Sequence, residues 1–294
     1  MILSASRRTD IPAFFSEWFF KRIEEGFVFV QNPFNLQQVP KIELSPDLID
    51  CIVFWTKNPS DLFIENLPRL DDLGYKYYFQ FTLTTYDKTI EKNVPRKKEI
   101  FEKFKLISDR IGRERIIWRY DPIFLSEHFN IEYHKKYFEY LAKTLSPYTE
   151  KCIISFLDFY PKIEKALAAQ EKRKMSVAEM SELAEIISAI ATSYNLKVET
   201  CCEDIDLSQF GITKSHCIDG ELIQKITGKE GSFKKDKNQR PGCGCISSVD
   251  IGVYNTCHHN CIYCYANRSS NVQIMNYDEN SPLLCSKLSG DESV

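Results

Sequence analysis

The sequence has no apolar run long enough to cross a bilayer, since eighteen consecutive apolar residues occur nowhere in it. Its opening segment, MILSASRRTDIP, also has no apolar stretch typical of a secretory signal peptide. Neither charge sign is in large excess, because the net charge is -3 and the pI is near 6.0. Such a balance gives no general attraction to nucleic acid or to membranes. We therefore expect a soluble, cytoplasmic protein with no membrane partner, and nucleic acid is not an expected partner.

Cysteine, in contrast, is abundant. The chain has eleven cysteines, and nine of them lie between residues 201 and 285. In a reducing compartment, clustered cysteines bind metals or do redox chemistry more often than they form disulfides. Cys51 and Cys152 lie apart from the others in apolar runs, and we expect them to pack in the core as small hydrophobic residues. The chemistry of this protein is therefore predicted to lie in the last third of the chain.

Strand-like and helix-like segments alternate regularly over the first 200 residues. Short apolar or β-branched runs predict strands at 2–6, 51–55, 77–84, 115–120, 152–159 and 196–200. Apolar residues that recur every three or four positions predict helices at 14–26, 59–74, 95–112, 131–145 and 176–195. This alternation is typical of a parallel sheet covered by helices. The predicted fold is α/β, a partial or complete β/α barrel of the TIM type.

The pattern changes after residue 200, where a helix is predicted near 219–228 and a basic stretch follows at 229–245. One more strand is predicted at 248–254, and it leads directly into a group of three cysteines. We expect residues 1–200 to form the β/α units of the barrel. Residues 201–294 are expected to form a cysteine-rich region that adds the last strand and a cluster-binding loop to the same domain.

The three cysteines lie in the segment CHHNCIYCY, as Cys257, Cys261 and Cys264. A loop with these spacings can bring each thiolate to a different iron of one [4Fe-4S] cluster, which leaves the fourth iron without a protein ligand. A metal with an open position can bind a small molecule directly. The alternative is structural zinc, with His258, His259 or His216 as the fourth ligand. His258 and His259 are otherwise expected to face solvent.

The spacing C-x3-C-x2-C, with Tyr263 before the last cysteine, resembles the signature of the radical S-adenosylmethionine superfamily. The resemblance implies a β/α barrel, S-adenosylmethionine bound at the open iron, adenine contacts near Tyr263, and an external electron donor such as flavodoxin or ferredoxin. In that superfamily the motif follows the first strand, whereas here it follows the last. We interpret this as a circular permutation, in which 248–254 is the superfamily's first strand and 2–6 its second. The superfamily's glycine-rich segment after the second strand is replaced here by SASRRTD.

Other segments resemble two smaller groups. CYAN, TKNP, FTLTTYD and WRYDPI are similar to strand ends of the spore photoproduct lyase-like branch. SASRRTDIP, FWTKNP, KDKNQR and CGC are similar to the uncharacterised family that carries domain of unknown function 1848, over nearly the whole chain. The first of these resemblances makes a nucleic-acid lesion repair lyase an alternative function, although the net charge argues against it.

Polar residues at the predicted strand ends are candidate pocket residues. They are Arg7, Arg8, Asp10, Thr56, Lys57, Gln80, Thr82, Thr84, Arg119, Asp121, Asp158 and Glu199. Among these, Arg7, Thr82 and Arg119 join Tyr263 as predicted cofactor-binding residues. No catalytic residue is identified, and the candidates are Arg119 and Asp121, which alternate on one strand and so point to one face. An ion pair with a purely structural role is the alternative for each.

A second set of cysteines consists of Cys201, Cys217, Cys243 and Cys245. It can bind a second [4Fe-4S] cluster, bind structural zinc, or remain as free thiols. Cys202 and Cys285 are expected to have no role. The basic run at 234–240 is expected to be a solvated loop, or a lid if the substrate is anionic.

The sequence therefore predicts an iron-sulfur radical S-adenosylmethionine enzyme that acts on an unknown small-molecule or peptide substrate. Two alternatives remain, a structural zinc-binding protein and an iron-sulfur electron-transfer protein.

Overall fold

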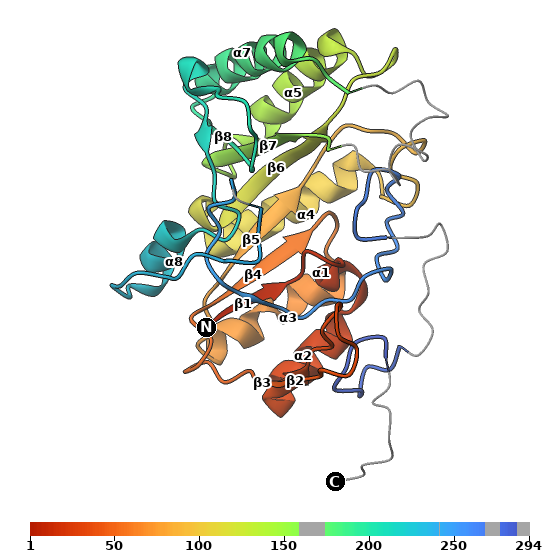
Figure 1. The fold of residues 1–294 in the computed structure, drawn as a ribbon, viewed down its shortest axis with the longest axis vertical. Helices are drawn as coiled ribbons and strands as arrows, with labels where there is room; N and C mark the ends of the chain where they lie inside the picture. Colours follow the sequence, from red (N-terminus) through yellow and green to blue (C-terminus); the bar gives the residue numbers. More distant parts are fainter. Residues whose placement is uncertain (159–173, 241, 268–276, 287–294) are drawn as a thin grey trace.

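A parallel sheet of eight strands forms the centre of the computed structural model, which describes residues 1–158, 174–240, 242–267 and 277–286. Every pair of neighbouring strands in this sheet runs parallel. In sheet order the strands are β10 (Val249–Asp250), β1 (Ile2–Ala5), β4 (Cys51–Thr56), β5 (Tyr77–Thr82), β6 (Ile116–Ile123), β7 (Lys151–Phe156), β8 (Lys197–Thr200) and β9 (Thr213–Lys214). Figure 1 shows them stacked from β1 low in the view to β8 near the top.

Helices follow most of the strands, and side-chain caps fix where several of them begin. The helices are α1 (Ile11–Phe14), α2 (Ser16–Glu25), α3 (Asp61–Asp72), α4 (Lys97–Ile111), α5 (Ile131–Leu145), α7 (Val177–Ser193) and α8 (Gly220–Thr227), with short 3₁₀ turns at Arg113–Arg115 and Ser208–Phe210. The Ser60, Asn130 and Ser176 side chains accept hydrogen bonds from the first turns of α3, α5 and α7. These caps agree with the helix starts expected from the sequence.

The larger core lies between the sheet and α3, α4, α5 and α7. Alternate strand residues point to this side, and many are aromatic. Phe54 contacts Phe63 of α3 with 5.0 Å between ring centroids, and Trp118 stacks on Phe138 of α5 at 5.1 Å. Burial of such large apolar side chains is the main force that holds the helices to the sheet.

The opposite face of the sheet, here called the inner face, carries a smaller core. Strand residues such as Val53, Tyr78 and Ile117 pack there against Ile218 and Ile223 from the region around α8. The chain after residue 200 therefore covers part of the inner face, and α8 projects to the left of the sheet in Figure 1. The cysteine-rich region thus contributes to the core.

The structure confirms the α/β fold with a large parallel sheet. Each predicted strand and helix is present, with bounds that differ by a few residues; position 159, the last of one predicted strand, lies outside the described residues. A closed barrel is not formed, since within the described ranges no pairing joins β9 to β10. These two edge strands have two residues each and offer too few backbone groups to close the sheet.

The last strand lies beside the first, as expected for a permuted chain. Leu3 and Ser4 pair with Val249 and Asp250. A Cβ atom on Gly252 would lie 2.0 Å from the Oγ atom of Ser6, so only glycine allows the two segments to pass this closely. The sequence did not predict the antiparallel hairpin of β2 (Phe27–Phe29) and β3 (Lys41–Glu43). None of the described helices is long and apolar enough to cross a membrane.

Candidate functional site

The three-cysteine loop lies at the carboxyl ends of the parallel strands, where the blue segments run along the right of Figure 1. It is held there by the segment after β5. Cys261 forms an isolated antiparallel bridge with Glu91, and the Ile262 amide donates to the Ile90 carbonyl at 3.0 Å. The Asn93 amide donates to the His259 carbonyl at 3.1 Å. The loop is therefore fixed by backbone hydrogen bonds to a segment more than 160 residues away in sequence.

Two asparagines shape the loop. Asn255 and Asn260 have φ angles of 64° and 51°, in the left-handed region that asparagine tolerates better than most residues. The Asn267 side chain donates to the Cys257 carbonyl at 2.8 Å, which ties the end of the motif to its beginning. These contacts turn the chain so that the three cysteines lie on one short loop.

His259 is buried, with 3% of its surface exposed, so the expectation that it faces solvent is wrong. Its Nε2 lies 2.8 Å from Asp10 Oδ2, and a carboxylate only accepts, so Nε2 donates. Asp10 also accepts from the Lys57 amide at 2.7 Å. His258 packs on the ring of Phe14, with 4.8 Å between centroids. Contacts with Asp10 and with Phe14 of α1 thus cover His259, whereas His258 is half-buried.

Glu91 is a buried charged residue beneath the loop, and no pattern in the sequence points to its role. It is buried, and it accepts hydrogen bonds from Lys57 at 2.7 Å, Thr84 at 2.8 Å, Lys97 and Tyr263. Burial alone would raise the pKa of Glu91, but the charges of Lys57 and Lys97 lower it below its usual value. Glu91 is therefore an anion that orients the predicted cofactor-binding Tyr263.

The motif thiols lie in a water-poor environment. Burial raises the pKa of Cys261, and burial followed by the charges of Cys264 and Asp10 raises that of Cys257. Loading of a metal at these thiols must therefore displace protons. Among the described residues, no three His, Cys, Asp or Glu side chains surround a point closely enough for a single metal ion. A cluster does not need such a point, because each thiolate binds a different iron.

Four buried polar atoms in or near the loop have no hydrogen-bond partner among the described residues. They are Thr9 Oγ1, Asn58 Oδ1, His259 Nδ1 and Asn267 Oδ1. Because a buried polar atom without a partner is costly, such a group is typical of a site that binds a polar ligand. The residues around the motif thus fit a polar cofactor.

Arg7 lies between the motif loop and the second cysteine set. Its amide donates to Asp250 Oδ2 at 2.8 Å, and its carbonyl accepts from Tyr265 at 2.8 Å. Its guanidinium lies 5.9 Å from the centre of the Trp55 ring. Asp250 also accepts from Ser4 at 2.9 Å and from Ser6 at 2.5 Å, so it joins β10 to β1.

Arg119 and Asp121 point to the same face, as their alternation predicts. Arg119 Nε lies 3.1 Å from Asp121 Oδ1, so the carboxylate that this arginine grips belongs to its own strand. Another nitrogen, Nη1, donates to Gln80 at 3.2 Å and to Cys217 Sγ at 3.0 Å. Thr82 pairs with Arg119 on the neighbouring strand. The predicted cofactor-binding residues Thr82 and Arg119 are thus side by side, and Arg119 contacts the second cysteine set.

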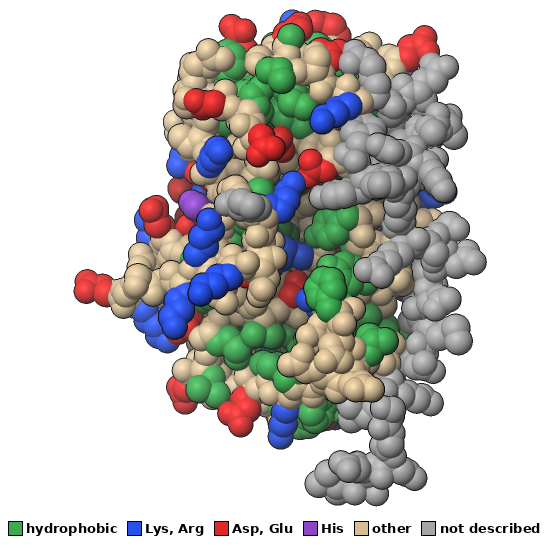
Figure 2. Space-filling view, in the orientation of Figure 1, with side chains coloured by type: hydrophobic (Ala, Val, Ile, Leu, Met, Phe, Trp, Pro, Cys, Tyr) green, Lys and Arg blue, Asp and Glu red, His purple; other side chains and the backbone are tan. Residues whose placement is uncertain are grey.

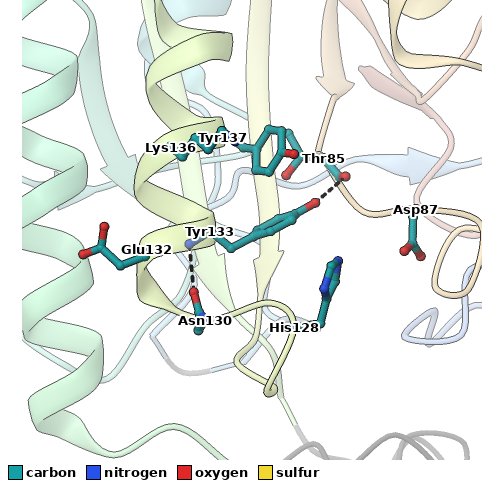
Figure 3. Close-up of a pocket in the computed structure, with 8 residues that line it drawn as sticks. All are labelled: Thr85, Asp87, His128, Asn130, Glu132, Tyr133, Lys136 and Tyr137. Atoms are coloured by element: carbon teal, nitrogen blue, oxygen red, sulfur yellow. Dashed lines mark hydrogen bonds between the residues drawn. The ribbon is translucent and has the colours of Figure 1, made fainter.

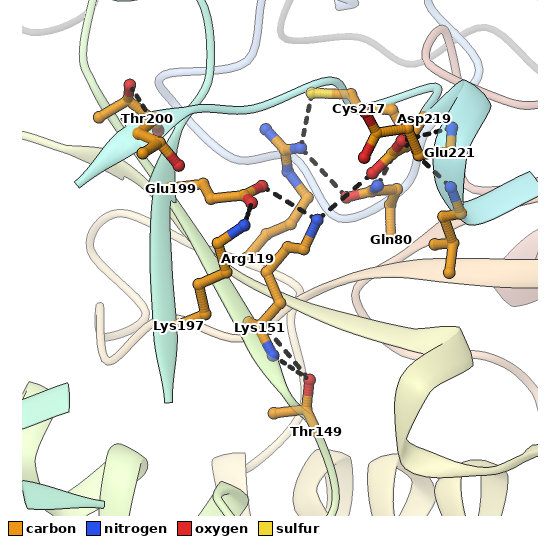
Figure 4. A network of polar contacts seen from close by, with 12 residues as sticks. Gln80, Arg119, Thr149, Lys151, Lys197, Glu199, Thr200, Cys217, Asp219 and Glu221 are labelled. Carbon is orange, nitrogen blue, oxygen red and sulfur yellow. Dashed lines mark hydrogen bonds and ion pairs between the residues drawn. The ribbon is translucent and has the colours of Figure 1, made fainter. Parts of the chain in front are cut away.

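The four cysteines of the second set come together against the inner face. Cys201 Sγ and Cys217 Sγ are 2.9 Å apart, and Cys245 interacts with both Cys217 and Cys243. Figure 4 shows Cys217 above Arg119, beside an ion-pair network in which Lys151 contacts Glu199 at 3.0 Å and Asp219 at 3.3 Å. Cys202, next to Cys201 in sequence, takes a left-handed φ of 56°.

The remaining predicted pocket residues are spread around the sheet. Arg8 lies 5.4 Å from the centre of the Tyr254 ring, and Asp158 pairs with Arg240 at 2.6 Å in an exposed contact. That pair ties the basic run to the end of β7. Figure 2 shows Lys and Arg side chains gathered over α8 and the segment after it, where the exposed lysines are Lys225, Lys229, Lys234, Lys235 and Lys237.

A separate surface pocket of about 510 Å³ lies between the loop after β5 and the start of α5. Figure 3 shows Tyr133 at its centre, donating to the Thr85 carbonyl at 2.8 Å, with His128 nearby. None of the residues predicted from the sequence lines this pocket.

Comparison with known proteins adds a family. The sequence model of the family described as "Domain of unknown function (DUF1848)" matches residues 2–266. The chain belongs to that family. A search of curated proteins finds no match to this DUF1848 chain. A solved structure described as "putative alpha-L-fucosidase from Bacteroides thetaiotaomicron VPI-5482" aligns at 11% identity, covering 64% of this chain and 76% of that one, with a TM-score of 0.26.

Proposed function

We propose that this DUF1848 protein is a radical S-adenosylmethionine enzyme, with Cys257, Cys261 and Cys264 as the ligands of a [4Fe-4S] cluster. The main support is the position of the C-x3-C-x2-C loop at the carboxyl ends of a parallel sheet, directly after a strand that pairs with β1. Parallel α/β folds bind ligands at that edge. The chemistry supplied by a reduced cluster, when bound, is cleavage of S-adenosylmethionine to methionine and a 5'-deoxyadenosyl radical.

The protein's own residues would orient the cofactor and exclude water. Thr9 Oγ1, Asn58 Oδ1 and His259 Nδ1 are buried groups that could pair with polar atoms of S-adenosylmethionine. Asp10 holds the His259 ring so that Nδ1 carries the free lone pair. Tyr263, fixed by Glu91, would place the backbone of the loop against adenine.

The test is anaerobic purification, followed by iron and sulfide analysis and an assay for 5'-deoxyadenosine under reducing conditions. We expect about four irons per chain at the motif and release of 5'-deoxyadenosine on reduction. Cys261→Ser should abolish both, while Cys285→Ser, which changes a half-buried cysteine outside the motif, should retain both. A protein without iron would contradict the proposal. A cluster whose EPR signal is unchanged by S-adenosylmethionine would favour an electron-transfer protein.

A further inference from the structure

The surface pocket between the loop after β5 and the start of α5 has aromatic walls. Tyr133 and Tyr137, one turn apart on α5, lie with 4.4 Å between ring centroids, and the His128 ring lies 5.5 Å from that of Tyr133. Both tyrosines are half-buried, and His128 is exposed. The volume of about 510 Å³ is within the range of small-molecule sites, which is about 300–1,000 Å³. The rings can therefore pack against the apolar body of a small ligand.

The pocket lies at the carboxyl ends of two neighbouring strands of the parallel sheet. Thr85 and Asp87 follow β5, whereas His128 and the first turn of α5 follow β6. In parallel α/β folds, loops from adjacent strands meet at this edge, and ligands bind between them. The position of the pocket is therefore typical of a binding site.

Two carboxylates give the pocket a negative charge. In Figure 3, Glu132 and Asp87 lie on opposite sides of Tyr133. Asp87 Oδ1 accepts from the Thr89 amide at 2.8 Å, and within the described part of the chain no ion pair includes Asp87. Glu132 pairs only loosely with Lys135, at 3.9 Å between two exposed side chains. Burial raises the pKa of Tyr133, and the charge of Asp87 adds to this rise. Both carboxylates are therefore available to a cation.

Lys136 shows that a cation can lie against these rings. Its Nζ is 5.3 Å from the centre of the Tyr137 ring, within the distance of about 6 Å that is typical of a cation–π contact. Lys136 is exposed, so its side chain can move away from the ring. A positively charged ligand would take the place of this ammonium group.

An anion fits the same pocket less well. The first turn of a helix attracts anions through its free amides and its dipole. At α5, however, the Asn130 side chain already accepts from the Tyr133 amide at 2.9 Å, and Glu132 places a negative charge in that turn. The cap and the charge both act against an anionic ligand.

We propose that this pocket binds a small organic ammonium ion, with its apolar body against Tyr133 and Tyr137 and its charge toward Asp87 and Glu132. Attraction between a cation and the face of an aromatic ring adds to the ionic attraction of the carboxylates. The site is separate from the motif loop and does not depend on the function proposed for that loop.

The test measures the affinity of the full chain for 2-phenylethylammonium by ligand-observed NMR. The comparison ligand is 3-phenylpropionate, an anion of similar size and shape. We expect the cation to bind about tenfold more tightly or better, because the two ligands differ mainly in the sign of their charge. Equal affinities, tighter binding of the anion, or absence of binding by the cation would overturn the proposal.

Variants of the pocket test each contribution to the affinity for the cation. Tyr137→Leu should weaken binding about threefold because it removes a ring face, and Asp87→Asn with Glu132→Gln should weaken it about fivefold. Lys136→Met should strengthen binding about threefold, because it removes a like charge from the Tyr137 ring. Lys143→Met, at an exposed position of the same helix, is the matched control and should leave the affinity unchanged.

These substitutions change exposed or half-buried side chains, and circular dichroism checks that each variant is folded. Unchanged affinity after loss of both carboxylates, or weaker binding after Lys136→Met, would contradict the proposed orientation of the ligand. Iron content is measured on the same samples, and its absence would affect only the function proposed for the motif loop.

Discussion

At the scale of single residues, Glu91 makes the clearest case that a charged group can be structural in a functional site. It lies in the segment TTYDKTIEKN, which has neither helical nor strand periodicity, so the sequence indicates an ordinary surface residue. Its partners Lys57 and Tyr263 come from segments far apart in sequence. No local pattern encodes that convergence, and the residue could not be found without the fold.

Replacement of Glu91 by glutamine should destabilise the protein by about 3 kcal/mol, because it leaves the buried charge of Lys57 without its partner. The value is at the lower end for a buried pair because the other partner, Lys97, is partly exposed. Urea unfolding monitored by circular dichroism measures the change. Glu24→Gln is the matched control, since Glu24 pairs with Arg69 at the surface and its loss should cost less than about 1 kcal/mol. Equal effects of the two substitutions would contradict the role of Glu91.

At the scale of elements, the sequence predicted most of the architecture. The six strands and five helices predicted for the first 200 residues are present because apolar periodicity and burial agree in each of them. The hairpin of β2 and β3 escaped prediction because its three-residue strands are too short and too exposed to show a pattern. Residue type alone suggests that the four cysteines of the second set form one group. Their close approach depends on how the chain after β8 and around α8 packs on β5.

Helix α5 carries a pH-sensitive contact. His134 is fully buried, its Nε2 donates to the Phe124 carbonyl at 3.0 Å, and its Nδ1 accepts from Tyr120 at 2.9 Å. Burial lowers its pKa to about 4 from the model-compound value of 6.5. The unfolded chain therefore binds a proton before the folded one does, so stability is complete above pH 6.5 and is lost as the pH falls toward 4.

The expected loss is about 3 kcal/mol between pH 7 and pH 4, at about 1.4 kcal/mol for each unit of the pKa difference. His134→Gln should flatten this part of the stability profile, although it is less stable at neutral pH. Denaturant unfolding at a series of pH values gives the slopes. The same substitution at the exposed His128 should leave the slope as it is in the wild type. An unchanged slope in the His134 variant would refute the assignment.

The close contact between Ser6, after β1, and Gly252, after β10, allows a second test at this scale. Gly252→Ala should destabilise the fold by a few kcal/mol, because the added methyl group meets Ser6. Ser6→Gly removes the obstructing atoms, so the double variant should lose less stability than the two single variants added together. Thermal unfolding of all four proteins measures the coupling. Strict additivity would show that the close approach of the two segments does not determine stability.

At the scale of the whole molecule, the place of the motif loop near the end of the sequence is compatible with a site at the carboxyl ends of the sheet. The sheet brings β10 beside β1, so the motif loop, near the end of the sequence, contacts Asp10, which follows β1, and Glu91, which follows β5. The order of segments along a chain matters less than their neighbours in space. The resemblance to the radical S-adenosylmethionine superfamily predicted that the last strand lies beside the first. The periodicity of the sequence did not predict that the sheet stays open at β9 and β10.

Hydrogen exchange should report how the motif loop is joined to the rest of the molecule. In the unloaded protein, amides of β4 to β7 should exchange slowest, because these strands are paired on both sides and covered by large side chains. The two-residue strand β10 should exchange faster. A cluster that binds only the folded loop stabilises the loop and the segments that contact it, by mass action.

Anaerobic reconstitution should therefore slow exchange several-fold in two separate segments, 248–256, which leads into the loop, and 87–94, which pairs with it. Helix α7, which packs against α5, should keep its rate. Mass spectrometry of peptides before and after reconstitution makes the comparison. Protection confined to 257–264 would mean that the segment after β5 does not support the cluster loop, whereas protection of both segments would identify them as one cooperative unit with it.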